Sequence, residues 1–264
     1  MFPFKQKPKK ITLVLGGGAA RAIAHIGVLE VLDREKIPID LIVATSMGSA
    51  IGAAYSLDLN LKRVEKMALG ISFRDLIDVI IPRIAINQGK KLAETISRLT
   101  QNKGFEDLNI PLAVVATDIS NGQTVVYRSG NLSQAITASC SIPVVYRPIK
   151  IDDRFIVDGG IKNTVPVAVA RQLGAKFIIA SDVGFCIKKA LPGNIFQMMM
   201  QTYQIQGQEL SNYQSMDAEV VIKPKLGEID QMAFDRAAEC IEKGREAGEA
   251  ALKKLKNFLP PGPR

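Results

Sequence analysis

The stretch that decides the fold runs from Leu41 to Gly52 and reads LIVATSMGSAIG. Its apolar first residues predict a buried strand, and the small residues that follow predict a helix packed closely on that strand. Between them lies Ala44-Thr45-Ser46-Met47-Gly48, an order typical of a nucleophile elbow, where a sharp strand-to-helix turn exposes a serine hydroxyl. Ser46 is therefore a candidate nucleophile on a turn that Gly48 supports, and the alternative is a chance occurrence of this short pattern. Residues 41–57 carry no charge, but they fall short of the roughly 20 residues that a membrane span needs.

A second apolar run, residues 11–15, ends in three glycines and leads into a helical pattern from Ala19 to Lys36. Strand, glycine-rich turn, helix and strand form a βαβ unit, so we expect a parallel sheet covered by helices. Further strands are expected at 112–117, 124–128, 149–151, 155–157, 177–181 and 219–222, and further helices within 60–104 and at 132–138, 167–173, 195–215 and 229–258.

The composition is that of a globular protein: of 264 residues, 47% are apolar and 23% are charged. We expect one domain over 11–258, with its motifs in 11–182, between a basic lead at 1–10 and a proline-rich tail at 259–264. The net charge of +8 favours anionic partners, but no nucleic-acid motif accompanies it. Lysines near both ends and the apolar segment 76–86 suggest a surface that meets anionic membranes. Within that segment, residues 79–86 either pack in the core or line an acyl pocket.

Cysteine usage and the N-terminal sequence bear on localisation. Cys140, Cys186 and Cys240 are far apart and form no C-x-x-C pattern, which favours a reducing compartment over a metal or disulfide framework. Residues 9–24 imitate a signal peptide, but Arg21 and three glycines interrupt the apolar run. We therefore expect a cytoplasmic protein with peripheral contact at the inner membrane surface. The oligomeric state is left open.

A serine nucleophile needs a base. The one histidine, His25, lies within the first expected helix, roughly 10 Å from the glycine-rich turn, so we expect it to be a packed helix residue. Asp158 is the better candidate, because Gly159 and Gly160 let the backbone turn and approach another element. An aspartate is a weak base unless burial raises its pKa, so Asp158 should lie in a confined pocket. A plain Asp-Gly turn is the alternative.

The glycine-rich turn ends a strand and opens a helix, so its N–H groups converge on one spot with the helix dipole behind them. The natural source of an oxyanion site is therefore the turn Gly16-Gly17-Gly18. Dinucleotide binding is the rival interpretation, but Arg21 replaces the third glycine of G-x-G-x-x-G, and the next strand leads to Ser46 rather than to an acidic residue. Arg21 orients the loop, attracts an anionic head group or forms a structural salt bridge.

Four motifs occur in a fixed order along the chain. They are Gly16-Gly17-Gly18-Ala19-Ala20-Arg21, His25-Ile26-Gly27-Val28-Leu29, Thr45-Ser46-Met47-Gly48 and Asp158-Gly159-Gly160, with further matches at Thr117-Asp118-Ile119 and Ala138-Ser139-Cys140-Ser141-Ile142-Pro143. In this combination the chain resembles the patatin-like phospholipase family, well over residues 11–182 and loosely beyond. The resemblance implies a three-layer α/β/α fold with a mainly parallel central sheet. It also implies an activity that requires no metal or cofactor. It also implies that Ser46 is the nucleophile and Asp158 the general base in the hydrolysis of phospholipid, lysophospholipid or other acyl-lipid esters. The resemblance further implies an oxyanion hole formed by Gly17, Gly18 and Ala19.

The chain departs from the family pattern where glycine is common, at Ala19, Ala22, Ala44 and Val144. None of these changes removes a reactive group. Ala19 keeps its N–H but takes positive φ less freely than glycine, so a loop that needs this conformation would be distorted. The departures motivate an alternative function, a weakly active or inactive patatin-like protein that binds lipid or a partner in a regulatory role.

Overall fold

The computed structural model describes residues 10–78, 85–187 and 190–258. Its strands in the main sheet are β1 (Ile11–Leu15), β2 (Leu41–Thr45), β4 (Leu112–Asp118), β5 (Thr124–Tyr127), β7 (Ile149–Ile151), β8 (Arg154–Asp158), β9 (Phe177–Ser181) and β10 (Val220–Ile222). They form an eight-stranded sheet in the order β10-β9-β1-β2-β4-β8-β7, with β5 also paired to β4. The pairings from β10 through β4 are parallel, and those of β5, β7 and β8 are antiparallel. The expected α/β fold with a mainly parallel sheet is confirmed.

Helices cover both faces of the sheet. They are α1 (Ala24–Arg34), α2 (Met47–Asp58), α3 (Leu61–Gly70), α4 (Lys90–Leu99), α5 (Leu132–Ser139), α6 (Val167–Gln172), α7 (Ile195–Gln214) and α8 (Ala237–Phe258). Side chains alternate along the strands, because successive residues of a strand point to opposite faces. In β1, Leu13 and Leu15 belong to the core shared with α1, α2 and α8, whereas Val14 belongs to the core shared with α6. The sheet is therefore the middle of three layers.

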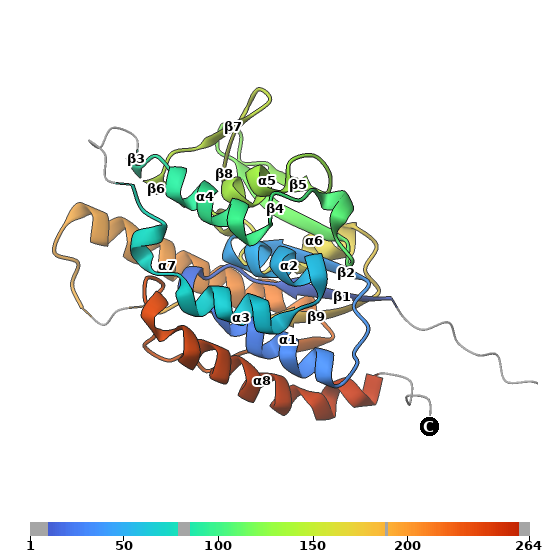
Figure 1. The fold of residues 1–264 in the computed structure, drawn as a ribbon. Helices are drawn as coiled ribbons and strands as arrows, with labels where there is room; N and C mark the ends of the chain where they lie inside the picture. The colour runs from blue at the N-terminus through green and yellow to red at the C-terminus, as the bar shows by residue number, and fades with distance from the viewer. Residues whose placement is uncertain (1–9, 79–84, 188–189, 259–264) are drawn as a thin grey trace, which may run out of the picture.

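The last helix, α8, packs directly on the first, α1 (Figure 1). A Cβ at Gly27 would lie 2.0 Å from the carbonyl oxygen of Ile241, and one at Gly244 would lie 1.9 Å from that of Ala24. Both contacts are shorter than any side chain tolerates, so each helix needs glycine where the two backbones meet. The C-terminal helix thus belongs to the same core as the first βαβ unit.

Two expected helices begin differently in the structure. The first starts as a 3-10 helix at Ala19–Ile23, before α1. The last begins at Ala237, after a 3-10 turn at Phe234–Arg236, and not at Ile229. The carbonyls of Gly227 and Ile229 accept hydrogen bonds from Arg21, and the carbonyl of Gln231 accepts one from Ala20. These lateral bonds hold the segment 227–231 in a non-helical conformation.

A short parallel pair, β3 (Ala85–Asn87) with β6 (Val144–Tyr146), is not predicted by the sequence pattern. Within the apolar segment 76–86, Leu76 and Ala85 are buried. The expectations for residues 79–84, for 1–9 and for the tail at 259–264 lie outside the described residues. In the part of the chain that the structure describes, no helix combines the length and the apolar character needed to cross a membrane.

Candidate active site

The turn between β2 and α2 holds Ser46 in a strained conformation, with φ of 53° and ψ of −135°. Gly48 makes this turn possible, because a Cβ there would lie 2.5 Å from the carbonyl oxygen of Gly16. The Ser46 N–H donates to Ser139 Oγ (2.8 Å), whose hydroxyl donates to the carbonyl of Val115 (2.6 Å). The elbow therefore packs closely on the residue that follows β1, and Ser139 links it by hydrogen bonds to β4.

Asp158 reaches Ser46 because two strands end beside consecutive residues of β4. Thr45, the last residue of β2, pairs with Val115, while Asp158, the last residue of β8, pairs with Ala116. The Ser46 hydroxyl consequently donates a hydrogen bond of 2.6 Å to Asp158 Oδ2 across 112 positions of sequence. Such a contact meets the distance requirement for a base acting on a nucleophile.

The two glycines after Asp158 serve this approach in different ways. A Cβ at Gly159 would lie 2.3 Å from the carbonyl oxygen of Val115, so only glycine lets the turn lie against β4. The N–H of Gly160 donates to Asp158 Oδ1 (2.7 Å) and fixes the orientation of the carboxyl group.

Burial raises the pKa of Asp158 from 3.8 to about 7. Its side chain is 1% exposed, and removal from water disfavours the charged carboxylate. Hydrogen bonds from Ser46, Gly160 and Tyr203 act in the opposite direction, because they stabilise the charge. The result is a carboxyl group able both to accept and to return a proton near neutral pH.

His25 is a packed helix residue, as predicted. It is fully buried, and its two ring nitrogens are hydrogen bonded to Ser181 Oγ and to the carbonyl of Gly16, both at 2.8 Å. Burial lowers its pKa to about 4, so the imidazole is neutral at neutral pH. Both ring nitrogens are hydrogen bonded to groups other than Ser46, whereas the Asp158 carboxyl group is hydrogen bonded to the serine hydroxyl.

The glycine-rich turn departs from expectation at one residue. The N–H of Gly17 donates to the carbonyl of Thr164 (2.9 Å), so Gly17 is not an available oxyanion donor. Among the described residues, the N–H groups of Gly18 and Ala19 have no acceptor. Both residues line the pocket that contains Ser46, so their amides are the candidate oxyanion donors.

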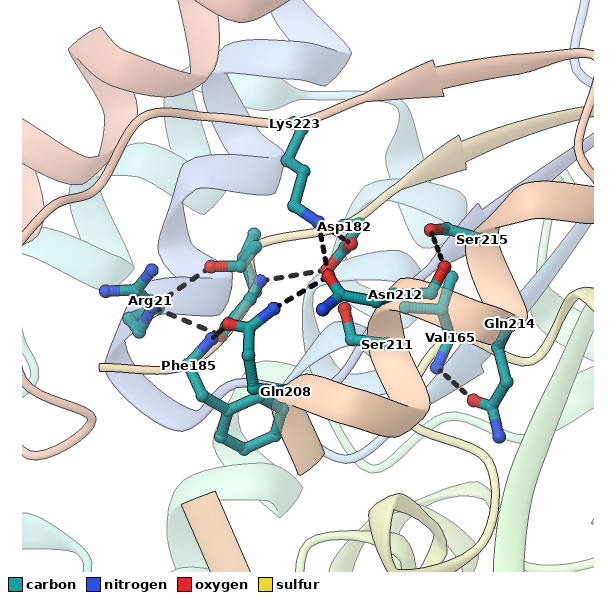
Figure 2. A network of polar contacts seen from close by, with 12 residues as sticks. Arg21, Val165, Asp182, Phe185, Gln208, Ser211, Asn212, Gln214, Ser215 and Lys223 are labelled. Carbon is teal, nitrogen blue, oxygen red and sulfur yellow. Dashed lines mark hydrogen bonds and ion pairs between the residues drawn. The ribbon is translucent and has the colours of Figure 1, made fainter. Parts of the chain in front are cut away.

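Arg21 fastens this turn from inside the protein. Its guanidinium group is buried and donates to the backbone carbonyls of Val183 and Gly184 and to those of Gly227 and Ile229 (2.7 Å for the last). Figure 2 shows the guanidinium directed at the segment that follows β9. Of the alternatives for Arg21, the geometry fits the one in which it orients the loop.

The positions that depart from the family pattern fall into two groups. Ala19 and Val144 adopt positive φ, at 49° and 71°, so the backbone there takes the left-handed conformation that glycine would favour. Ala22 and Ala44 are buried without positive φ. The backbone at Ala19 therefore adopts the positive φ that glycine would favour, although alanine carries a side chain.

Two pockets meet at Ser46. The first is lined by the glycine-rich turn and Asp158, and α7 supplies its wall through Met200, Tyr203 and Gln204. The second is apolar, and its lining includes Phe73, Leu76, Leu92, Cys140, Val145, Tyr146 and Phe234. Both share Ala19, Ser46, Ile142 and Met232.

Sequence reasoning missed the contribution of α7 to this site. Tyr203 interacts with the Asp158 carboxyl group and lies deep enough for burial to raise its own pKa well above the ordinary value. The sequence feature that could have indicated this role is a tyrosine within an expected helix that carries no charge between Ile195 and Gln208. Nothing in the local pattern, however, places that helix over the elbow.

Fold and geometry together define a class: α/β proteins in which a serine on a strand-to-helix elbow is hydrogen bonded to a buried aspartate. The family model described as patatin-like phospholipase matches residues 13–171. The chain is 36% identical over 182 residues to patatin-like phospholipase domain-containing protein 6 of Mus musculus, and 34% identical over 182 residues to lysophospholipase NTE1 of Debaryomyces hansenii. This chain belongs to the patatin-like phospholipase family. Family membership is consistent with lipid hydrolysis.

The matched regions cover 66% and 67% of this chain but only 13% of the mouse protein and 12% of the yeast protein. Among solved structures, VipD from Legionella pneumophila aligns with a TM-score of 0.61 at 14% sequence identity, over 94% of this chain and 67% of that one. At this identity the likeness concerns the fold alone.

Proposed function

We propose that this protein is a serine acyl hydrolase that cleaves ester bonds of phospholipids, lysophospholipids or related acyl lipids. The observation that carries the proposal is the 2.6 Å hydrogen bond from Ser46 Oγ to Asp158, a buried carboxyl group whose pKa is raised to about 7. A base with a pKa near the working pH is well matched to remove and return a proton.

The reaction follows from the positions of these groups. Ser46 Oγ attacks the ester carbonyl while Asp158 takes its proton, and the N–H groups of Gly18 and Ala19 stabilise the oxyanion. Asp158 then gives its proton to the departing alcohol, leaving an acyl group on Ser46. Asp158 next deprotonates a water molecule that attacks the acyl-enzyme, and the fatty acid leaves as Ser46 recovers its proton.

The apolar pocket beside Ser46 supports an acyl chain as the group transferred. Its lining from Phe73, Leu76 and Leu92 offers no charge, so it suits a hydrocarbon better than a polar group. The binding-protein alternative arises from the missing glycines. It is weakened because Ala19 adopts positive φ and keeps its amide at the pocket.

Covalent labelling with a fluorophosphonate probe, followed by peptide mapping, tests the proposal. We expect labelling at Ser46 in the native protein, none in Ser46→Ala, and a strongly reduced rate in Asp158→Asn. Asp153→Asn is the matched control, because this exposed residue lies in the turn before the same strand, β8. Absence of labelling in the folded native protein would leave the binding-protein alternative as the better account.

A further inference from the structure

The N-terminal part of α7 presents large apolar side chains to the solvent. Leu191, just before the helix, is 95% exposed, Ile195 is 81% exposed, and Met198 and Met199 are 52% and 44% exposed. Within the helix, Ile195, Met198 and Met199 lie at spacings of three and four, so they share one face, and Leu191 precedes Ile195 by four residues. No charged residue occurs between Ala190 and Gln208. We call these four residues the α7 apolar face.

Another face of the same helical turns forms the wall of the active site. Met200, Tyr203 and Gln204 line the pocket that contains Ser46. Their spacing of three and four residues places them on a second stripe of α7. One helix thus lines the pocket of the serine with one face and carries exposed apolar side chains on another.

The C-terminal half of α7 is fastened by polar contacts (Figure 2). Gln208 Oε1 accepts from the N–H of Phe185, Ser211 Oγ donates to Asp182, and Gln214 Oε1 accepts from the N–H of Val165. These bonds tie the helix to segments that follow strands of the sheet. In the N-terminal half, Gln197 and Thr202 on the outer side form hydrogen bonds within the helix and its cap, while Tyr203 and Gln204 on the pocket side bond to Asp158 and Gln231.

We propose that the α7 apolar face is the surface by which this protein docks on a lipid bilayer, with the polar half of α7 as its fixed base. The inference rests on the proposed function, because a lipid substrate must leave a bilayer or micelle to reach Ser46. Exposed apolar side chains can enter the layer of a bilayer where head groups meet acyl chains. Because this part of the helix carries no charge, the insertion incurs no free-energy cost for burying a charged group. Methionine adapts to irregular apolar surroundings, which suits contact with fluid acyl chains.

The location of the face argues for lipid over a protein partner. Docking through Ile195, Met198 and Met199 holds the wall of the Ser46 pocket against the layer that contains the substrate. An uncharged face also predicts a specific behaviour: binding to neutral phosphatidylcholine vesicles that persists at high salt. Contact through basic residues would instead require anionic lipid and weaken with salt.

Vesicle flotation with neutral phosphatidylcholine vesicles, at low and high salt, tests the docking. The protein carries Ser46→Ala in this assay, so that the vesicles remain intact. The test variant is Ile195→Ser/Met198→Gln/Met199→Gln. The matched control, Leu69→Ser/Tyr213→Ser/Met216→Gln, removes three apolar side chains of comparable exposure outside the α7 apolar face, at the end of α3 and around the C-terminal end of α7. We expect the test variant to bind at least roughly tenfold more weakly and the control to bind like the parent.

Hydrolysis of a water-soluble short-chain ester, measured with Ser46 present, separates docking from chemistry. The test variant should retain this hydrolysis while losing hydrolysis of vesicle lipid. The proposal is overturned if the parent protein does not bind neutral vesicles or if the test and control variants bind them equally well. It is also overturned if the α7 apolar face joins two copies of the parent protein and the monomer does not bind vesicles. Vesicle binding without ester hydrolysis would refute the proposed function and leave the docking surface in place.

Discussion

Burial raises the pKa of Asp158, which suits a general base but lowers the stability of the folded protein when the carboxyl group ionises. Replacing Asp158 with asparagine should therefore change activity and stability in opposite directions. Asparagine keeps the size of the side chain and can still accept the N–H of Gly160, but it never carries charge. We expect Asp158→Asn to lose activity, because no carboxylate remains to take the proton of Ser46. We also expect it to be more stable than the native protein at neutral and alkaline pH.

The size of this effect follows from linkage between protonation and folding. The folded-state pKa of about 7 lies about three pH units above the ordinary value of 3.8, and each unit corresponds to about 1.4 kcal/mol. Below about pH 4 both states of the native protein hold the proton, so asparagine confers no such advantage. As the pH rises to about 7, the unfolded state loses its proton first and the native protein loses stability. The advantage of Asp158→Asn therefore grows with pH, to at most about 4 kcal/mol.

Urea unfolding of both proteins from about pH 4 to about pH 8.5 measures the difference in unfolding free energy directly. If the proposed hydrolysis holds, kcat/KM of the native protein should also rise with pH and level off above an apparent pKa near 7. A stability difference that does not vary with pH, or that shrinks as pH rises, would refute the claim that burial governs this carboxyl group. Asp153→Asn serves as the control for simple loss of a negative charge.

Two further predictions concern residues that touch the same site. Tyr203→Phe removes a hydrogen bond that stabilises the Asp158 carboxylate, so the pKa of Asp158 should rise. The acidic limb of the kcat/KM profile should then move to higher pH. A midpoint that is unchanged or more acidic would contradict the assigned contact. Arg21→Met leaves four buried or partly buried carbonyls without their donor and should lower the unfolding free energy by at least about 3 kcal/mol; a loss below about 1 kcal/mol in urea unfolding would show that Arg21 does not hold the turn.

Local sequence patterns predicted the elements that carry the reacting groups. The apolar run before Ser46 and the small residues after it specify a strand and a helix that meet at a tight turn, and the structure has both. The two glycines after Asp158 predicted a close approach to another element, which is β4. His25 was placed in a helix by the pattern around it, and its burial there follows from the same periodicity.

Features that depend on distant segments could not be predicted in the same way. The engagement of the Gly17 amide depends on Thr164, and the late start of α8 depends on hydrogen bonds from Arg21 and Ala20. The role of Tyr203 depends on where α7 crosses the sheet. In each case the partner lies far along the chain, and no local periodicity encodes which carbonyl or carboxyl group will be within reach.

The close packing of α8 on α1 has a consequence for how this unit can be moved between proteins. The family match ends at residue 171, before α7, β10 and α8. A graft cut at that point would leave the face of α1 around Gly27 uncovered and would omit Tyr203 and Met232 from the Ser46 pocket. The smallest interchangeable module for building chimaeras with the longer relatives therefore extends through α8, and the family boundary marks shared motifs rather than a foldable piece.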